Sequence, residues 1–152
     1  MTNKKLAFMA IPAIAAIMIV GAFAPASAGE LGTVIDIKPG SFPNSINPSS
    51  NGVIPVAILG TSTWDASTVD PSSLVFTAAL DLTTSPNAIG FGFEDVNDDG
   101  LTDLVAHFPT QTTWIMCNTN LGQLYGHAFD LSPIIGFDSI NPVGKDCRKN
   151  TG

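Results

Sequence analysis

Short apolar runs separated by turn residues make up most of the chain after residue 28. They are rich in Val, Ile, Phe and Thr and are bounded by Gly, Pro, Asn, Asp or Ser, which is typical of strands and turns. The runs are LGTVIDI, GVIPVAILG, SLVFTAAL, IGFGFEDV, LTDLVAHF, TTWIMC, LGQLYGHAFD and PIIGFDSI. No helical periodicity is found among them. About seven or eight strands in about 120 residues predict an all-β fold, a single antiparallel β-sandwich of the immunoglobulin-like type.

Proline and asparagine set expectations at three places. Pro55 lies inside VIPVAIL and has no N–H for a ladder hydrogen bond, so we expect an edge strand or a strand that begins there. The segment TSTWDASTVDPSS is typical of a loop with one short helical turn. The sequence SINP occurs at 45–48 and again at 139–142, and its Asn-Pro pair predicts two similar turns.

The first 28 residues have the pattern of an export signal. Two lysines precede an apolar run at residues 6–24, and Ala-Ser-Ala at 26–28 fits a small-residue cleavage site. We predict a signal peptide at residues 1–28 and one β domain at 29–152, secreted or held at the cell surface. The alternative is a retained membrane anchor, because about 18 apolar residues can span a bilayer.

Acidic side chains dominate the expected mature chain. Two of the six Lys and Arg residues lie in the signal, and the other four stand against 13 Asp and Glu. Nucleic acid and anionic membrane surfaces would repel such a chain, so neither is an expected partner. Inorganic cations and neutral surfaces are compatible with it.

Two cysteines, Cys117 and Cys147, stand late in the chain. An even number in an exported protein favours a disulfide over two free thiols, which stay the alternative. A bridge that closes a loop of about 30 residues would stabilise the fold by roughly 3 to 4 kcal/mol. Its expected role is to hold the C-terminal tail against the domain.

The densest charge lies in GFGFEDVNDDGLTDLVAHF, residues 90–108, which holds five acids and no Lys or Arg. Four oxygen-bearing residues fit positions 1, 3, 5 and 9 of a D-x-N-x-D-G-x-x-D pattern, and they are Asp95, Asn97, Asp99 and Asp103. With Gly at position 6, such a loop curls so that these side chains and the position-7 carbonyl, from Leu101, converge on Ca²⁺. We therefore predict a calcium loop at residues 95–106.

This loop differs from the helix-loop-helix type. The bidentate Glu of position 12 is replaced by Ala106, and the flanking runs are strand-like. Water, Asp36 or Glu94 would supply the missing oxygens, and the expected affinity is that of extracellular modules, about 10⁻⁴ to 10⁻³ M. The alternative is a plain hairpin, since Asp99-Gly100 is a favoured turn pair.

No residue pattern for catalysis stands out. The motifs H-E-x-x-H and G-x-S-x-G and a glycine-rich phosphate loop are absent. His107 and His127 fall in strand-like runs, where we expect ordinary hydrogen-bonded strand residues. The chain is therefore predicted to be non-catalytic, and a small secreted hydrolase is the weaker alternative.

Three large aromatic residues are candidates for stacking on sugar rings. If Trp64, Trp114 and Tyr125 share an exposed face, the domain could be a carbohydrate-binding module. Large aromatics in a β domain of this size are more often core residues. The sequence leaves both interpretations open.

Three segments resemble a largely uncharacterised family of secreted prokaryotic β-rich domains. They are DIKPGSFPNSINPSSNGVIPVAILGT (36–61), FEDVNDDGLTDLVAHFPTQ (93–111) and GFDSINPV (136–143), and they are spread along nearly the whole of the expected mature chain. The resemblance implies export, a β fold and a calcium-type loop, and it brings no established activity. The loop is also similar to those of dockerin and thrombospondin repeats, which recur on unrelated folds.

These patterns give one functional hypothesis. The chain is predicted to be a secreted, calcium-binding, non-catalytic domain with a structural, adhesive or binding role at the cell surface. A glycan or a cell-surface protein would be its partner.

Overall fold

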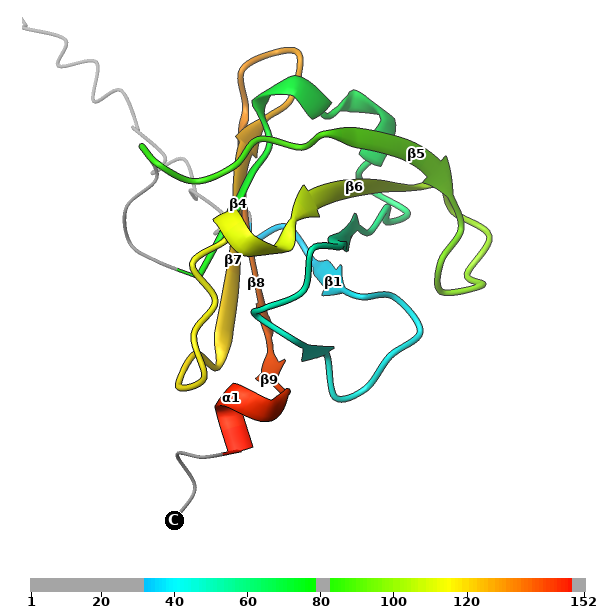
Figure 1. Ribbon diagram of the computed structural model, residues 1–152. Coiled ribbons are helices and arrows are strands. Elements are labelled where there is room, and N and C mark those ends of the chain that lie inside the picture. Colours follow the sequence, from blue (N-terminus) through cyan, green and yellow to red (C-terminus); the bar gives the residue numbers. More distant parts are fainter. Residues whose placement is uncertain (1–31, 79–82, 149–152) are drawn as a thin grey trace, which may run out of the picture.

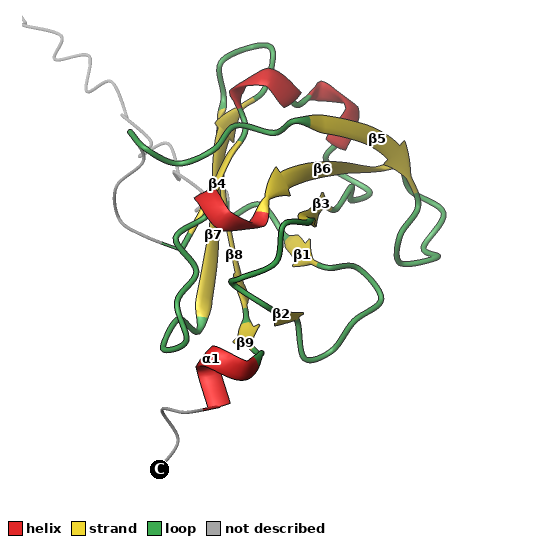
Figure 2. Cartoon of the chain, viewed as in Figure 1, coloured by secondary structure: helices red, strands yellow, loops and turns green. Residues whose placement is uncertain are grey.

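The computed structural model describes residues 32–78 and 83–148 (Figure 1). The predicted signal peptide at 1–28 lies outside the described residues. Within them the chain is mostly strand with almost no helix (Figure 2), which confirms the predicted all-β fold. The strands are β1 (Ile35–Ile37), β2 (Ser45–Ile46), β3 (Val53–Ile58), β4 (Val75–Thr77), β5 (Gly90–Glu94), β6 (Asp103–Pro109), β7 (Leu121–His127), β8 (Pro133–Ser139) and β9 (Asn141–Pro142).

Two antiparallel sheets carry the fold. Their strand orders are β1-β3-β6-β5 and β4-β7-β8, and Figure 1 shows them on the right and left of the view. Buried side chains from both sheets belong to one hydrophobic cluster. Phe76 of β4 meets Phe108 of β6 across this cluster, with ring centroids 5.5 Å apart. The two sheets therefore bury a common core, while the predicted sandwich geometry stays a prediction.

Helical structure in the described residues is limited to single short turns. They are the 3₁₀ turns η1 (Ala66–Thr68), η2 (Pro71–Ser73) and η3 (Thr110–Thr112) and the helix α1 (Lys145–Arg148). Asp65 and Asp70 cap η1 and η2, because each carboxylate accepts a hydrogen bond from the amide two residues on. The predicted loop TSTWDASTVDPSS thus holds two helical turns instead of one.

The expectation for Pro55 is wrong, because β3 begins at Val53 and lies between β1 and β6. In an antiparallel ladder the nitrogen and carbonyl of one residue face the same neighbouring strand. The carbonyl of Pro55 accepts from the amide of Lys38 at 2.8 Å, so its nitrogen faces β1 as well. The last residue pair between β1 and β3 is Ile37 with Val56, one residue before Lys38 on the β1 side. Pro55 therefore stands just past the end of β1, where no ladder partner requires its N–H.

The predicted turn at Asn-Pro forms in the first SINP only. The carbonyl of Asn47 accepts from the amide of Ser50 at 3.0 Å, which closes a turn, whereas Asn141 and Pro142 form β9. Ser45 pairs with Asn141, and Ile46 with Pro142, as the parallel strands β2 and β9. The amide of Asn141 donates to Asn44 at 3.0 Å and that of Val143 to Ile46 at 2.8 Å. Pro142 falls between these two donors, so the ladder forms without its missing N–H.

The run TTWIMC, residues 112–117, is a turn and not the predicted strand. The hydroxyl of Thr113 donates to the carbonyl of Thr110 at 2.7 Å, and that of Thr110 donates to Gly52 at 2.9 Å. Such side-chain bonds compete with a strand ladder for the backbone carbonyls. Trp114 has a positive φ of 58°, which ends any extended conformation.

Candidate functional site

The acidic stretch connects β5 to β6, and Figure 1 shows this connection protruding at the right of the molecule. The two carboxylate oxygens of Asp95 accept from the amides of Asp99, at 3.1 Å, and Gly100, at 2.8 Å. The side chain of Asn97 also accepts from the amide of Asp99, at 3.2 Å. A carboxylate oxygen of Asp99 accepts from the amide of Leu101 at 2.8 Å. The side chains at positions 1, 3 and 5 of the predicted loop therefore turn toward its own backbone.

Two residues with positive φ curl the loop. Asp98 has a φ of 59° and Gly100 a φ of 83°. Glycine adopts this left-handed conformation without a steric penalty, and aspartate tolerates it better than most residues do. The Asp-Asp-Gly sequence is thus well suited to the bend that the structure shows.

Asp103 differs from the other predicted ligands because it is fully buried. One of its carboxylate oxygens accepts from the amide of Gly60 at 2.8 Å, and the other accepts from the amide of Val96 at 2.9 Å. A Cβ atom at position 60 would lie 2.5 Å from the carbonyl oxygen of Thr102, so only glycine fits there. Asp103 therefore fastens the loop to the chain just beyond β3, a role that its spacing did not predict.

No group of three or more His, Cys, Asp or Glu side chains in residues 32–78 and 83–148 is arranged to hold a metal ion. The position of Asp103 explains this, because its carboxylate points to Gly60 and Val96. Asp95 and Asp99 are then the remaining acids at predicted ligand positions, together with the amide oxygen of Asn97. The predicted ligand set then has two carboxylates, where the sequence pattern has three.

The two acids considered as extra ligands lie in different places. Glu94 is exposed at the end of β5, opposite Asp103 in the ladder. Asp36 lies on β1, which β3 and β6 separate from β5, so the sheet does not bring it to the loop. It lies instead near Asp138, and burial followed by the charge of Asp138 raises the pKa of the Asp36 carboxyl.

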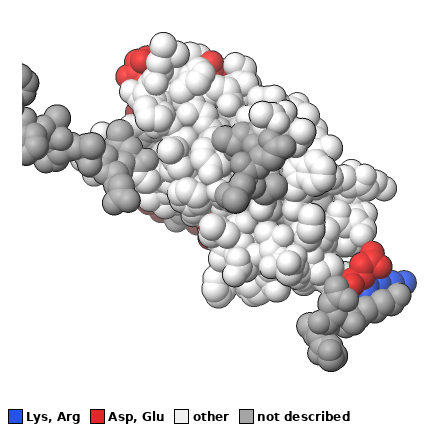
Figure 3. All heavy atoms as spheres, turned by 90° about the vertical axis from the view of Figure 1, so that its left-hand side faces the viewer, with Lys and Arg blue, Asp and Glu red and all other residues white. Residues whose placement is uncertain are grey.

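Basic side chains are scarce around these acids. The sequence has no Lys or Arg between Lys38 and Lys145. The ammonium group of Lys38 donates to the carbonyl of Ser45 at 2.7 Å. On the side of the molecule seen in Figure 3, the visible Asp and Glu lie mainly near its two ends. The loop carboxylates thus have no Lys or Arg from residues 39–144 to balance them.

The three aromatic candidates are distributed over the fold. Trp64 is half-buried, packs against the core and lines a cavity of about 490 Å³ that neither of the others lines. Trp114 is 48% exposed on the turn after η3. Tyr125 is half-buried on β7 and packs edge to face with Phe137 of β8, with ring centroids 6.4 Å apart. Each aromatic therefore has a separate environment.

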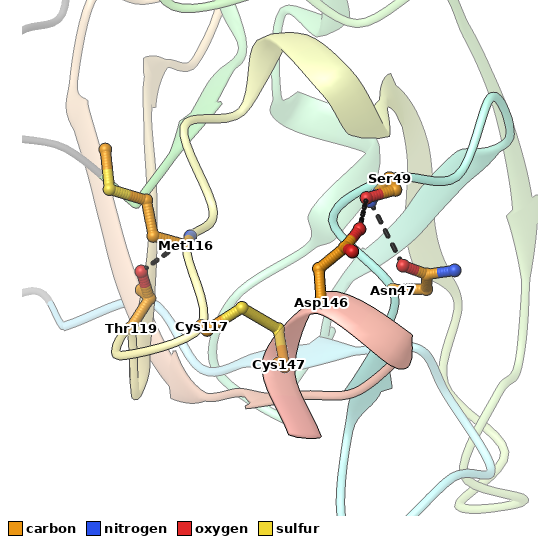
Figure 4. The surroundings of a disulfide bond; sticks show 7 residues. All are labelled: Asn47, Ser49, Met116, Cys117, Thr119, Asp146 and Cys147. Carbon is orange, nitrogen blue, oxygen red and sulfur yellow. Dashed lines mark hydrogen bonds between the residues drawn. A yellow bond between two sulfur atoms is a disulfide. The ribbon is translucent and has the colours of Figure 1, made fainter. Parts of the chain in front are cut away.

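The predicted disulfide is confirmed, since Cys117 and Cys147 are bonded at an S–S distance of 2.09 Å. It joins the turn before β7 to α1 (Figure 4). The hydroxyl of Ser49 also donates to Asp146 at 3.0 Å. The C-terminal helix is thus held to two distant parts of the chain, as expected for this tail.

The histidines offer no assembled catalytic group in the described residues. His107 and His127 are half-buried on β6 and β7, and a ring nitrogen of His127 lies 3.0 Å from the carbonyl of Ala128. No helix of the described segments is long and apolar enough to cross a membrane. Comparison of the chain with family models, curated proteins and solved structures finds no match.

Proposed function

We propose that this chain is an exported, non-catalytic β domain that binds calcium through the β5–β6 loop and acts in structure, adhesion or binding at the cell surface. The supporting observation is an acidic loop curled by its own carboxylates in a region without Lys or Arg. Uncompensated carboxylates at such spacing favour a hard cation that prefers oxygen ligands.

The residues that fit calcium are Asp95, Asn97 and Asp99, with the carbonyl of Leu101. Each amide hydrogen bond uses one lone pair of an oxygen that has two, so these acceptors keep capacity for a cation. Asp103 would act from inside, by holding the loop to Gly60. Four protein oxygens are fewer than the six to eight that calcium takes, so water would complete the shell and the affinity would be low.

Thermal melting of the purified, oxidised protein tests this proposal. With a dissociation constant of about 10⁻⁴ to 10⁻³ M, calcium at about 10 mM should raise the melting temperature by roughly 5 to 10 °C. Magnesium should give a much smaller rise, because it demands near-ideal octahedral geometry. Chelator should remove the effect.

A matched pair of variants tests the assignment. Asp99→Ala should lose the calcium-dependent rise, whereas Asp98→Asn, which removes one charge at a position outside the ligand pattern, should keep it. Asparagine tolerates the positive φ of residue 98. The proposal fails if calcium has no effect, or if both variants lose the effect equally.

A second candidate function, carbohydrate binding, is favoured by the outer face of β7 and β8. Phe137 is 51% exposed there beside Tyr125, whose hydroxyl donates to Gln123 at 2.6 Å. Figure 3 views this side and shows little charge in its middle. An exposed phenyl ring packed against a half-buried tyrosine, next to a hydrogen-bonding amide, suits a neutral sugar ring.

A glycan array followed by binding to the selected sugar separates the two candidates. Phe137→Ala should weaken that binding by at least tenfold, whereas Phe129→Ala, at an exposed residue after the end of β7, should not change it. If no glycan binds, or if both variants bind like the parent, the carbohydrate function is rejected and the calcium proposal is unaffected.

A further inference from the structure

A cavity lies beside Trp64 in the described part of the chain. Its volume is about 490 Å³, within the range of about 300 to 1,000 Å³ that is typical of small-molecule sites. Its walls come from the 61–64 turn, from Asp65 and Thr68 at the two ends of η1, from the β7–β8 turn and from the segment 32–34.

Backbone hydrogen bonds hold these walls together. Thr61 and Trp64 exchange two such bonds, of 2.8 and 3.2 Å. The amide of Phe129 donates to Thr68 at 2.9 Å, which joins the β7–β8 turn to η1. In Figure 1 this turn lies beside the short helical turns at the top of the molecule. The cavity is therefore built by paired segments that are far apart in the sequence.

The lining combines negative charge with apolar surface. Asp65 and Asp130 supply two carboxylates, and no Lys, Arg or His lines the cavity. The apolar part includes the indole of Trp64 with Leu59 and Ile134. An anionic ligand would meet two like charges and no counter-charge, so phosphates and carboxylates are excluded.

Each of the two carboxylates has one oxygen engaged by the backbone. Asp65 accepts from the amide of Ser67 at 2.8 Å, and Asp130 accepts from the amide of Ser132 at 2.9 Å. These hydrogen bonds, made to the charged form, lower the pKa of both carboxyls. Both groups are thus negative at neutral pH, and both aspartates are exposed, so a ligand in the cavity can reach them.

We propose that this cavity binds a small organic cation, an ammonium compound with an apolar body. The ammonium group would pair with Asp65 and Asp130, and the apolar body would lie against Trp64, whose ring face attracts cations. A neutral sugar would leave both negative charges without a counter-charge. The site is distinct from the calcium loop, so it stands or falls independently of the calcium proposal.

Tryptophan fluorescence can report on this cavity directly. Trp64 and Trp114 are the only tryptophans, so Trp114→Phe leaves Trp64 as the sole reporter. In this background we expect saturable quenching by benzylammonium and at least tenfold weaker binding of benzyl alcohol, which has the same ring without the charge. Added salt should weaken the binding of benzylammonium. Equal binding of the two compounds, or binding of glucose without benzylammonium, would overturn the proposal.

Charge-removing variants locate the effect. Asp65→Asn and Asp130→Asn should each weaken benzylammonium binding by about tenfold or more, which corresponds to the loss of one charge-assisted contact. Asparagine caps a helical turn as well as aspartate does, so these variants should fold, and circular dichroism checks this.

Asp70→Asn is the matched control. Asp70 caps η2 as Asp65 caps η1, but it does not line the cavity. We expect its affinity for benzylammonium to stay within about twofold of the parent, since a distant charge is screened by salt. The proposal is refuted if all three variants lose affinity equally, or if none does.

Discussion

Strands β5 and β6 are hydrogen-bonded neighbours, but they lie in opposite environments. Every residue of β5 is exposed, whereas most of β6 is buried. Phe91 and Phe93 stand opposite Ala106 and Leu104, so they point to the same face of the sheet. Phe108 of β6 meets the other sheet, while the two β5 rings meet each other at 6.1 Å. The apolar pattern therefore predicts a strand, but the burial of its side chains depends on whether another sheet packs over them.

Alanine substitutions in the two strands should give the largest contrast. Phe108→Ala removes a fully buried ring and should lower the free energy of unfolding by about 3 to 5 kcal/mol. Phe91→Ala removes a ring that is 56% exposed and should cost less than about 1 kcal/mol. Urea unfolding measures both values. Similar losses would show that β5 is buried in solution, for example against a partner.

The disulfide lies outside the hairpin formed by β5 and β6, so its loss should lower the stability of both strands alike. Cys117 and Cys147 are 30 residues apart, so a Cys117→Ser, Cys147→Ser variant should lose about 3 to 4 kcal/mol of stability. Hydrogen exchange should still show β6 better protected than β5. Reductant should destabilise the parent and leave the variant unchanged. A variant as stable as the parent would contradict the predicted stabilisation.

Two acids in and beside the β5–β6 loop show the same contrast between buried and exposed residues, because Asp103 is buried and Asp98 is exposed. Asp103→Ala leaves the amides of Gly60 and Val96 without their acceptor and should cost about 2 to 3 kcal/mol. The exposed Asp98 accepts no such bond in the described residues, so Asp98→Asn should change stability by less than about 0.5 kcal/mol. Urea unfolding in chelator separates this effect from any effect of calcium. Equal costs would mean that burial does not distinguish the two acids.

Most strands could be predicted from the sequence because their signal is local. Runs such as GVIPVAILG and LTDLVAHF carry β-branched and aromatic residues between turn formers, and both became strands. The same rule failed for TTWIMC, where threonine hydroxyls bind nearby carbonyls. It also missed β2 and β9, which are two residues long and pair across 96 positions of sequence. Such pairing depends on tertiary contacts that no local pattern contains.

The candidate sites divide in the same way. The spacing of Asp95, Asn97 and Asp99 predicted a curled loop, because those contacts span at most five residues. The bond from Gly60 to Asp103 joins residues 43 apart and could not be read from the motif. The Trp64 cavity, with Asp130 from a distant turn, was equally hidden.

The opposite edge of the four-stranded sheet gives the smallest expected effect. Burial, and then the charge of Asp138, raises the pKa of Asp36 on β1, so its ionised form is disfavoured in the fold. A raised folded-state pKa contributes stability at low pH that is lost as pH rises through that pKa. Asp36→Asn should therefore unfold at a slightly higher urea concentration than the parent at pH 7. After solvent screening the gain should stay below about 1 kcal/mol.

The pH dependence of the difference between Asp36→Asn and the parent distinguishes this cause from a change in packing. The difference should shrink below about pH 4, where an unperturbed aspartate is protonated. Asp98→Asn, measured in parallel, should show no such trend of comparable size. An advantage of Asp36→Asn that grows as pH falls would mean that the Asp36 carboxylate is stabilised in the fold. In that case β1 would hold a carboxylate that stabilises the fold, and burial would not be the main influence on the pKa of Asp36.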